Sequence, residues 1–151
     1  MMDAKKTGET PLHILLVEDD DDHAEIVMRT IAGTQTPSTI TRVKEGESAL
    51  RYLRRSDEYL DAPRADIILL DLKLPGRSGI EILREIKNDT DLKRLPVVIL
   101  STSSAETDRC RAYENHANSY VVKPVNFVRF RQLVADLCMY WGVWSHPHSE
   151  N

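Results

Sequence analysis

Apolar and polar positions along the chain change their spacing several times. Short apolar runs, three of them almost continuous, alternate with segments whose apolar residues recur at helical spacing. Continuous apolar runs are typical of strands that helices cover on both faces of a parallel sheet. Strands are predicted at Leu12–Val17, Thr39–Val43, Asp66–Leu70, Val97–Leu100 and Ser119–Val122. Their alternation with helices predicts right-handed crossovers, and therefore an α/β fold with a doubly wound, five-stranded parallel sheet and five helices.

Capping residues mark several of the expected helix ends. The predicted helices begin near Asp22, Glu47, Ser78, Ser103 and Asn126. Ser78–Glu81 and Ser103–Glu106 both have the capping-box pattern, in which a hydroxyl and a carboxylate each bond a free backbone N–H. Gly33 suits the C-terminal cap of the first helix, and Asn126 is a good N-cap for the last. The polar stretch Ser56–Arg64 is predicted to be a loop.

Length and composition favour a single globular domain. The chain has 151 residues, of which 41% are hydrophobic and 29% charged, as in ordinary domains of this size. Residues 1–11 are expected to form a disordered lead, 12–141 the domain, and 142–151 a tail too short for a DNA-binding module. Near that boundary, Trp141 and Trp144 either cap the protein's own core or pack against a second subunit.

Net charge, hydropathy and the two cysteines limit the expected cellular compartment and classes of partner. The formal net charge of −4 argues against nucleic acid as the main partner, because phosphate backbones bind basic surfaces. No apolar run approaches the roughly 20 residues of a membrane span, and the N-terminus lacks the apolar stretch of a signal peptide. Cys110 and Cys138 match no zinc spacing. We therefore expect a cytoplasmic protein with neither a membrane nor a nucleic-acid partner.

Chemically active side chains follow four of the predicted strands. They are Glu18 and Asp19, then Asp71, then Ser101 and Thr102, and finally Lys123. Ligands of doubly wound sheets bind beyond the carboxyl ends of the strands, so these groups should converge on one edge. Two carboxylates about 4 Å apart repel by about 4 kcal/mol at an effective dielectric of 20, which favours a bound divalent cation. Oxygen ligands with room for water suit Mg²⁺.

The segments that carry these residues resemble the receiver domain of bacterial response regulators. The similar segments are Leu15–Asp19 with its acidic pair, Ile68–Gly76 around Asp71, Leu95–Ser101 with its hydroxyl, and Tyr120–Pro124 with its Lys-Pro pair. The likeness covers about Leu12 to Tyr140. It implies the flavodoxin-like strand order 2-1-3-4-5.

By this resemblance, Asp71 is the nucleophile that takes a phosphoryl group from a phosphohistidine on a sensor kinase. Glu18, Asp19, Asp71 and the backbone carbonyl of Lys73 would hold Mg²⁺, and Lys123 would pair with a phosphate oxygen. The protein would thus catalyse its own phosphorylation and its own slow dephosphorylation without being an enzyme in the ordinary sense.

The resemblance also implies a switch. Ser101 would swing its hydroxyl toward the phosphate while Tyr120 turns inward behind it. Thr102 is the alternative hydroxyl, and Ser101 is favoured by register. The family resemblance further implies a cis peptide bond between Lys123 and Pro124.

A narrower likeness concerns the partner. The loop Ser56–Arg64 and the segments Asn88–Pro96 and Lys123–Asn126 look like those of stand-alone receivers paired with phytochrome-type sensor kinases. This likeness implies a light-sensing kinase as phosphoryl donor. It also implies a homodimer formed through the fourth helix, fifth strand and fifth helix.

Two other classes of protein place an acidic or phosphate-binding site at this sheet edge. A phosphatase of the haloacid dehalogenase type uses a strand-end aspartate with Mg²⁺, but needs a second aspartate where this chain has Lys73. A flavodoxin-like FMN carrier needs a phosphate-binding loop after the first strand, where Glu18 and Asp19 would repel the phosphate.

Overall fold

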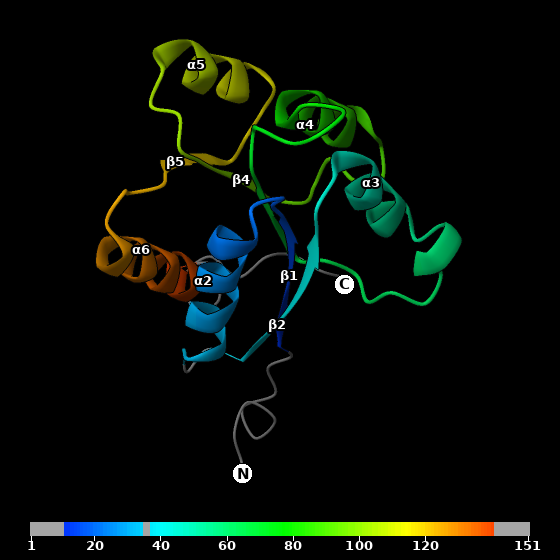
Figure 1. Cartoon of the computed structure of the whole chain (residues 1–151). Helices are drawn as coiled ribbons and strands as arrows, with labels where there is room; N and C mark the ends of the chain where they lie inside the picture. The colour runs from blue at the N-terminus through cyan, green and yellow to red at the C-terminus, as the bar shows by residue number, and fades with distance from the viewer. Residues whose placement is uncertain (1–10, 35–36, 141–151) are drawn as a thin grey trace.

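Five parallel strands form one sheet in the order β2-β1-β3-β4-β5 (Figure 1). The computed structural model describes residues 11–34 and 37–140. The strands are β1 (Leu12–Val17), β2 (Ser38–Val43), β3 (Ile67–Leu70), β4 (Val97–Ser101) and β5 (Ser119–Val122). In register, Ile14 of β1 pairs with Ile40 of β2 and Ile67 of β3. The predicted fold class and strand order are confirmed.

Helices cover both faces of this sheet. They are α2 (Asp21–Ala32), α3 (Gly46–Arg54), α4 (Gly79–Asn88), α5 (Glu106–Glu114) and α6 (Phe127–Met139), with a short 3₁₀ helix η1 (Asp57–Tyr59) inside the predicted loop. Helices α2 and α6 lie side by side on one face, and α3, α4 and α5 cover the other (Figure 1).

Successive strand residues supply two separate cores. In β1, Leu15 and Val17 join the core under α3, α4 and α5, whereas Ile14 and Leu16 join the core under α2 and α6. Successive side chains of a strand point to opposite faces of the sheet, so a strand covered on both faces must be apolar throughout. This is the physical reason for the uninterrupted apolar runs in the sequence.

Three of the four cap predictions are confirmed. Ser78 and Glu81 form a capping box with two bonds of 3.3 Å, Gly33 caps α2, and Asn126 accepts from the N–H of Arg129 at 3.0 Å. The capping box expected at Ser103–Glu106 was wrong.

Helix α5 begins at Glu106, and its N-cap, Ala105, offers no side-chain bond. The Ser103 hydroxyl instead donates to Asp108 at 2.5 Å and accepts from the N–H of Ala105. Such local bonds of serine compete with helix formation.

The Lys123–Pro124 bond also differs from expectation. No peptide bond within the described residues is cis, so this one is trans. The trans form before proline is favoured by only about 0.5–1 kcal/mol, and the backbone that leaves β5 therefore decides the isomer. The predicted roles of Trp141 and Trp144 concern positions outside the described residues.

Candidate functional site

Backbone hydrogen bonds between neighbouring strands continue for one residue beyond the ends of β1, β3 and β5, and they place the site residues at one edge of the sheet. The N–H of Glu18 donates to Val43 at 3.0 Å, that of Asp71 to Val17 at 3.1 Å, and that of Lys123 to Ser101 at 2.7 Å. Each of these residues therefore directly continues a strand of the sheet. The expected convergence at the carboxyl edge is confirmed for Glu18, Asp71 and Lys123.

Lys123 joins the two buried carboxylates. Its Nζ donates to Glu18 Oε1 at 2.6 Å and lies 3.4 Å from Asp71 Oδ2. The side chains of Glu18 and Lys123 are each 2% exposed, and that of Asp71 is 10% exposed. A buried charge needs a partner, and here one ammonium serves two carboxylates.

Burial is the main influence on the pKa of Glu18. Burial raises the pKa of Glu18 to about 7, against the hydrogen bond from Lys123, and the nearby charge of Asp71 adds to the rise. A cation bound beside Glu18 would favour the ionised form of this buried carboxyl.

Three carboxylates are close enough to hold a metal ion. One oxygen each of Glu18, Asp19 and Asp71 lies within 4.8 Å of the others, with Asp19 on the solvent side. This donor set, all hard oxygen and open to water on one side, fits a divalent cation such as Mg²⁺ or Mn²⁺. Lys73 has an exposed side chain, and its N–H donates to Asp71 Oδ1 at 3.3 Å. Metal ligation by its carbonyl remains a prediction.

A glycine brings the start of α4 against the acidic loop. A Cβ atom on Gly79 would lie 2.3 Å from the carbonyl oxygen of Asp71 and 2.6 Å from Cα of Leu72. The N–H of Gly79 also donates to Leu72 at 2.8 Å. The backbone after Asp71 is thus supported by direct backbone contact with α4.

The hydroxyl predicted to act in the switch lies inside the molecule. Ser101 is fully buried at the end of β4 and accepts from the N–H of Ser103 at 3.1 Å, whereas Thr102 is exposed. Tyr120 is buried, with its ring 5.4 Å below the Arg109 guanidinium, and its hydroxyl donates to the Ser103 carbonyl at 2.8 Å. Ser101 is therefore the hydroxyl that faces the interior, in agreement with the register argument.

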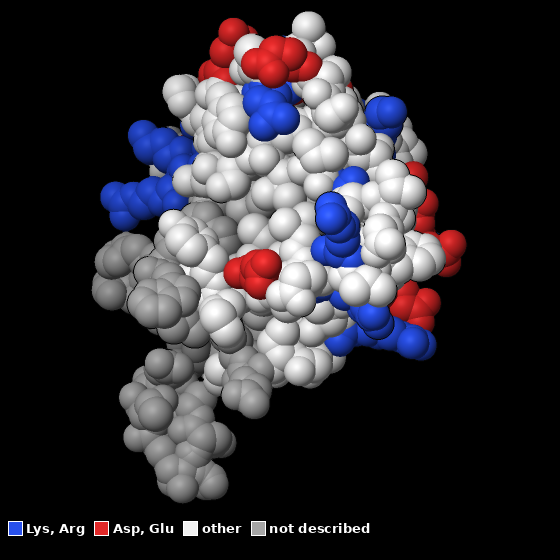
Figure 2. All heavy atoms as spheres, turned by 90° about the vertical axis from the view of Figure 1, so that its left-hand side faces the viewer, with Lys and Arg blue, Asp and Glu red and all other residues white. Residues whose placement is uncertain are grey.

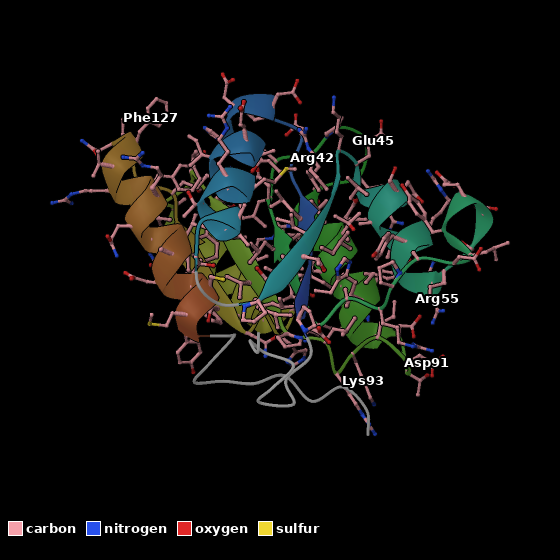
Figure 3. The ribbon with its side chains drawn as sticks, turned by 90° about the horizontal axis from the view of Figure 1, so that it is seen from below. Arg42, Glu45, Arg55, Asp91, Lys93 and Phe127 are labelled. Atoms are coloured by element: carbon pink, nitrogen blue, oxygen red, sulfur yellow. The ribbon has the colours of Figure 1, made fainter. Side chains whose placement is uncertain are left out.

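Two residues of the site were missed by sequence reasoning. His23, in the first turn of α2, has its Nδ1 3.0 Å from Lys123 Nζ. Arg42 of β2 (Figure 3) donates from Nε to the Glu18 carbonyl at 2.9 Å and pairs with Asp21, also at 2.9 Å. Neither position stands out in the sequence, because both reach the site across neighbouring elements.

A family model of the response regulator receiver domain matches residues 14–135. The probable methanogenesis regulatory protein FilR2 of Methanothrix harundinacea is 40% identical over 139 residues, covering 91% of this chain and 88% of that protein. The response regulator Rcp1 of Synechocystis sp. is 37% identical over 131 residues, covering 87% and 89%.

Solved structures agree. The phosphorylated cyanobacterial phytochrome response regulator RcpA superposes with a TM-score of 0.89 at 38% identity, covering 93% of this chain and 100% of that one. The Mn²⁺-bound form of Rcp1 gives 0.84 at 37% identity, covering 88% and 96%. The phosphatase and flavin-carrier alternatives are left without support.

Among the described residues, no helix has the length and apolar character that crossing a bilayer requires. The acidic edge, the buried lysine and the matches along the whole sheet agree, and the chain belongs to the response regulator receiver domain family of two-component signalling proteins.

Proposed function

We propose that Asp71 accepts a phosphoryl group from a phosphohistidine of a sensor histidine kinase, with Mg²⁺ bound by Glu18, Asp19 and Asp71. The observation that carries the proposal is the buried contact of Lys123 with both Glu18 and Asp71. It provides a nucleophilic carboxylate next to a fixed cation that can bind the oxygens of a phosphoryl group.

In the proposed transfer, one bond to phosphorus forms as another breaks. A carboxylate oxygen of Asp71 forms a bond to phosphorus as the bond from phosphorus to the donor's imidazole nitrogen breaks, and the imidazole leaves with the electron pair. Lys123 moves its donated bond from Asp71 to a phosphate oxygen. A divalent cation held by the carboxylates would offset negative charge on the transferred oxygens. Attack of water on phosphorus later releases phosphate and restores the carboxylate.

The readout we propose couples Ser101 to Tyr120. A phosphoryl group on Asp71 offers the Ser101 hydroxyl a strong acceptor, and that hydroxyl now accepts from the N–H of Ser103. The same residue, Ser103, holds Tyr120 through its carbonyl. Movement of Ser101 therefore shifts the segment that fixes Tyr120 and reaches α5 and β5, as a local charge event acting on a two-state surface.

For the donor, we propose a phytochrome-type sensor kinase in the cytoplasm. RcpA, which covers 93% of this chain, is a phytochrome response regulator. The test is phosphotransfer from a phosphorylated phytochrome kinase, compared with a sensor kinase that lacks a phytochrome module. Faster transfer from the phytochrome kinase is expected, and equal rates would contradict this pairing.

For the assembly, we propose a homodimer through α5, β5 and α6. Of the seven large hydrophobic side chains that are exposed within the described residues, five lie on α5, on α6 or between β5 and α6, and a sixth belongs to the C-cap residue of α6. They are Tyr113, Val125, Phe127, Val128, Met139 and Tyr140. Phe127 points outward from α6 (Figure 3) and is 63% exposed.

Exposed apolar groups gathered in one region are typical of an interface, and much of the surface between the scattered charges on this side is uncharged (Figure 2). Sedimentation of the wild type and of Phe127→Asp tests the dimer. A dimer that Phe127→Asp dissociates is expected. A monomer at all concentrations and phosphorylation states would contradict it.

The phosphoacceptor is tested with acetyl phosphate and Mg²⁺, read by intact mass. One added phosphoryl group is expected, and it should be absent in Asp71→Asn and after chelation of the metal. Asp91→Asn, at an exposed position far from the site (Figure 3), is the matched control and should be phosphorylated normally. Phosphorylation of Asp71→Asn to the wild-type level would overturn the assignment. If no adduct survives, beryllofluoride binding detects the same site.

A further inference from the structure

The buried ammonium of Lys123 has a third acceptor that the proposed reaction does not use. Its three acceptors are Glu18 Oε1 at 2.6 Å, His23 Nδ1 at 3.0 Å and Asp71 Oδ2 at 3.4 Å. An ammonium has three protons and accepts no hydrogen bond, so each proton has one partner. Because Lys123 can only donate, Nδ1 of His23 must accept, and the proton of the neutral ring must lie on Nε2.

The ring of His23 is held from two directions. Asp20, the N-cap of α2, accepts from the N–H of His23 at 3.0 Å and fixes its backbone. Phe130 of α6 meets the ring edge-on, with centroids 5.8 Å apart and planes at 84°. Phe130 is itself 1% exposed, so it cannot move aside easily. Nδ1 is thus aimed at Lys123 by contacts with Asp20 and Phe130, neither of which is one of the three carboxylates proposed as metal ligands.

We propose that His23 is a positioning residue for Lys123. Its Nδ1 accepts one proton of the ammonium and so keeps the ammonium beside Asp71, while the bond from the ammonium to Asp71 stays long. This inference rests on the proposed phosphoryl acceptance by Asp71. With Glu18 and His23 as two fixed acceptors, only the long bond to Asp71 has to be exchanged when a phosphate oxygen arrives. Two of the three bonds that orient the ammonium persist through the transfer.

Removing the acceptor should misplace the ammonium. A proton left without a partner at a buried site is costly, so Lys123 would turn further toward Asp71. The carboxylate oxygen would then be held by a shorter bond and would be a poorer nucleophile. His23 contacts Asp20, Lys123 and Phe130 and none of the three carboxylates proposed as ligands, so its replacement acts on the metal site only through Lys123.

Three substitutions of His23 distinguish the effect of losing the hydrogen-bond acceptor from the effect of losing the volume of the ring. His23→Asn places an amide oxygen near the position of Nδ1, His23→Gln places its polar end near Nε2, and His23→Leu has no polar atom. We expect phosphorylation by acetyl phosphate to slow about ten-fold in His23→Leu and His23→Gln, as for a lost bond to a charged group, and His23→Asn to recover most of the rate. Thermal unfolding confirms that each variant is folded.

The experiment measures phosphorylation rates by intact mass, together with ¹⁵N NMR of the His23 ring in the wild-type protein with and without Mg²⁺. We expect the proton on Nε2 and a nitrogen resonance at Nδ1 typical of an acceptor. A proton on Nδ1, or wild-type rates in both His23→Leu and His23→Gln, would overturn the inference. Failure of the wild type to accept any phosphoryl group would instead overturn the proposed function, and the ring spectrum would still decide whether His23 accepts from Lys123.

Discussion

The hydroxyl of Tyr120 donates to the carbonyl oxygen of Ser103 at 2.8 Å. The N–H of the same Ser103 donates to the hydroxyl of Ser101. A single backbone residue therefore links the buried hydroxyl at the end of β4 to the buried aromatic side chain of β5. On the readout proposed above, a change in the position of Ser101 alters the bond from the Ser103 N–H and so acts on Tyr120 without a direct contact between the two side chains.

Replacement of Tyr120 by Phe removes this link while keeping the ring. We expect the free energy of unfolding to fall by about 1 kcal/mol, the typical net value of one hydrogen bond. The rate of phosphorylation by acetyl phosphate should stay within about two-fold, since such a change corresponds to less than 0.5 kcal/mol in the barrier. Urea unfolding and intact mass measure the two quantities, with Tyr59→Phe in η1 as control. A ten-fold loss of phosphorylation would show that Tyr120 acts on the acidic site itself.

Replacement of Lys123 by Met leaves two buried carboxylates without their shared cation. We expect a loss of about 3 kcal/mol in the free energy of unfolding, as when one partner of a buried ion pair is removed. Added Mg²⁺ should restore part of this loss by binding the same carboxylates. Urea titrations with Mg²⁺ and with chelator measure both effects.

The exposed Lys93 (Figure 3) gives the matched control Lys93→Met, for which less than about 0.5 kcal/mol is expected. If, in the absence of metal, Lys123→Met were as stable as Lys93→Met, Glu18 and Asp71 would not both be ionised in the folded protein.

We expect the folded protein to lose stability in mild acid, because His13 is buried. Its ring lies near Thr39 and Tyr52, with ring nitrogens 2.5 Å and 2.7 Å from the two hydroxyls. Burial lowers the pKa of His13 below its usual 6.5, and the charge of Asp66 only partly opposes this. As the pH falls, His13 therefore binds a proton in the unfolded chain at a higher pH than in the folded protein. The contribution of His13 to the free energy of unfolding is present above pH 6.5 and is lost as the pH falls through its folded pKa.

The measurement is the free energy of unfolding from pH 7.5 to pH 5 for the wild type and His13→Gln. Below pH 6.5 the wild type should lose up to about 1.4 kcal/mol per pH unit more than the variant. The difference between the two proteins isolates His13 from the other titrating groups. Parallel curves would show that His13 is not kept neutral by the fold.

Replacement of Gly79 by Ala should disturb the backbone after Asp71. The added Cβ would meet backbone atoms at 2.3 Å and 2.6 Å, so α4 and the acidic loop must move apart. We expect a loss of about 1–3 kcal/mol in the free energy of unfolding, as in other overpacked sites, and slower phosphorylation. Gly33→Ala, whose Cβ would meet its nearest atom at 3.5 Å, is the control. An unchanged phosphorylation rate in Gly79→Ala would show that the loop is not held by α4.

Much of the fold was predictable because one physical rule governs it. The observed bounds of β1 and β5 match the predicted ones, since covered parallel strands must be apolar on both faces. The same topology brings all strand ends to one edge, which is why Glu18, Asp71 and Lys123 could be assigned to one site from their order in the chain.

The remaining features depend on directions that the sequence does not encode. His23 of α2 reaches Lys123 after β5, 100 residues further along the chain, and Arg42 reaches Glu18 from a neighbouring strand. The start of α5 was predicted wrongly because Ser103 bonds Asp108 and Ala105 instead of capping a helix at that point. Local patterns identify which groups can bond, and tertiary packing decides between them.

The position of Lys123 has a consequence for the growing chain. This lysine follows Glu18 by 105 residues and Asp71 by 52, so a ribosome exposes the acceptor carboxylate well before the cation that balances it. A nascent chain that has not reached β5 carries the carboxylates without their ammonium. On the function proposed above, a chain can accept a phosphoryl group with the help of this ammonium only after synthesis has passed β5, and a chain that stops before Lys123 lacks the cation.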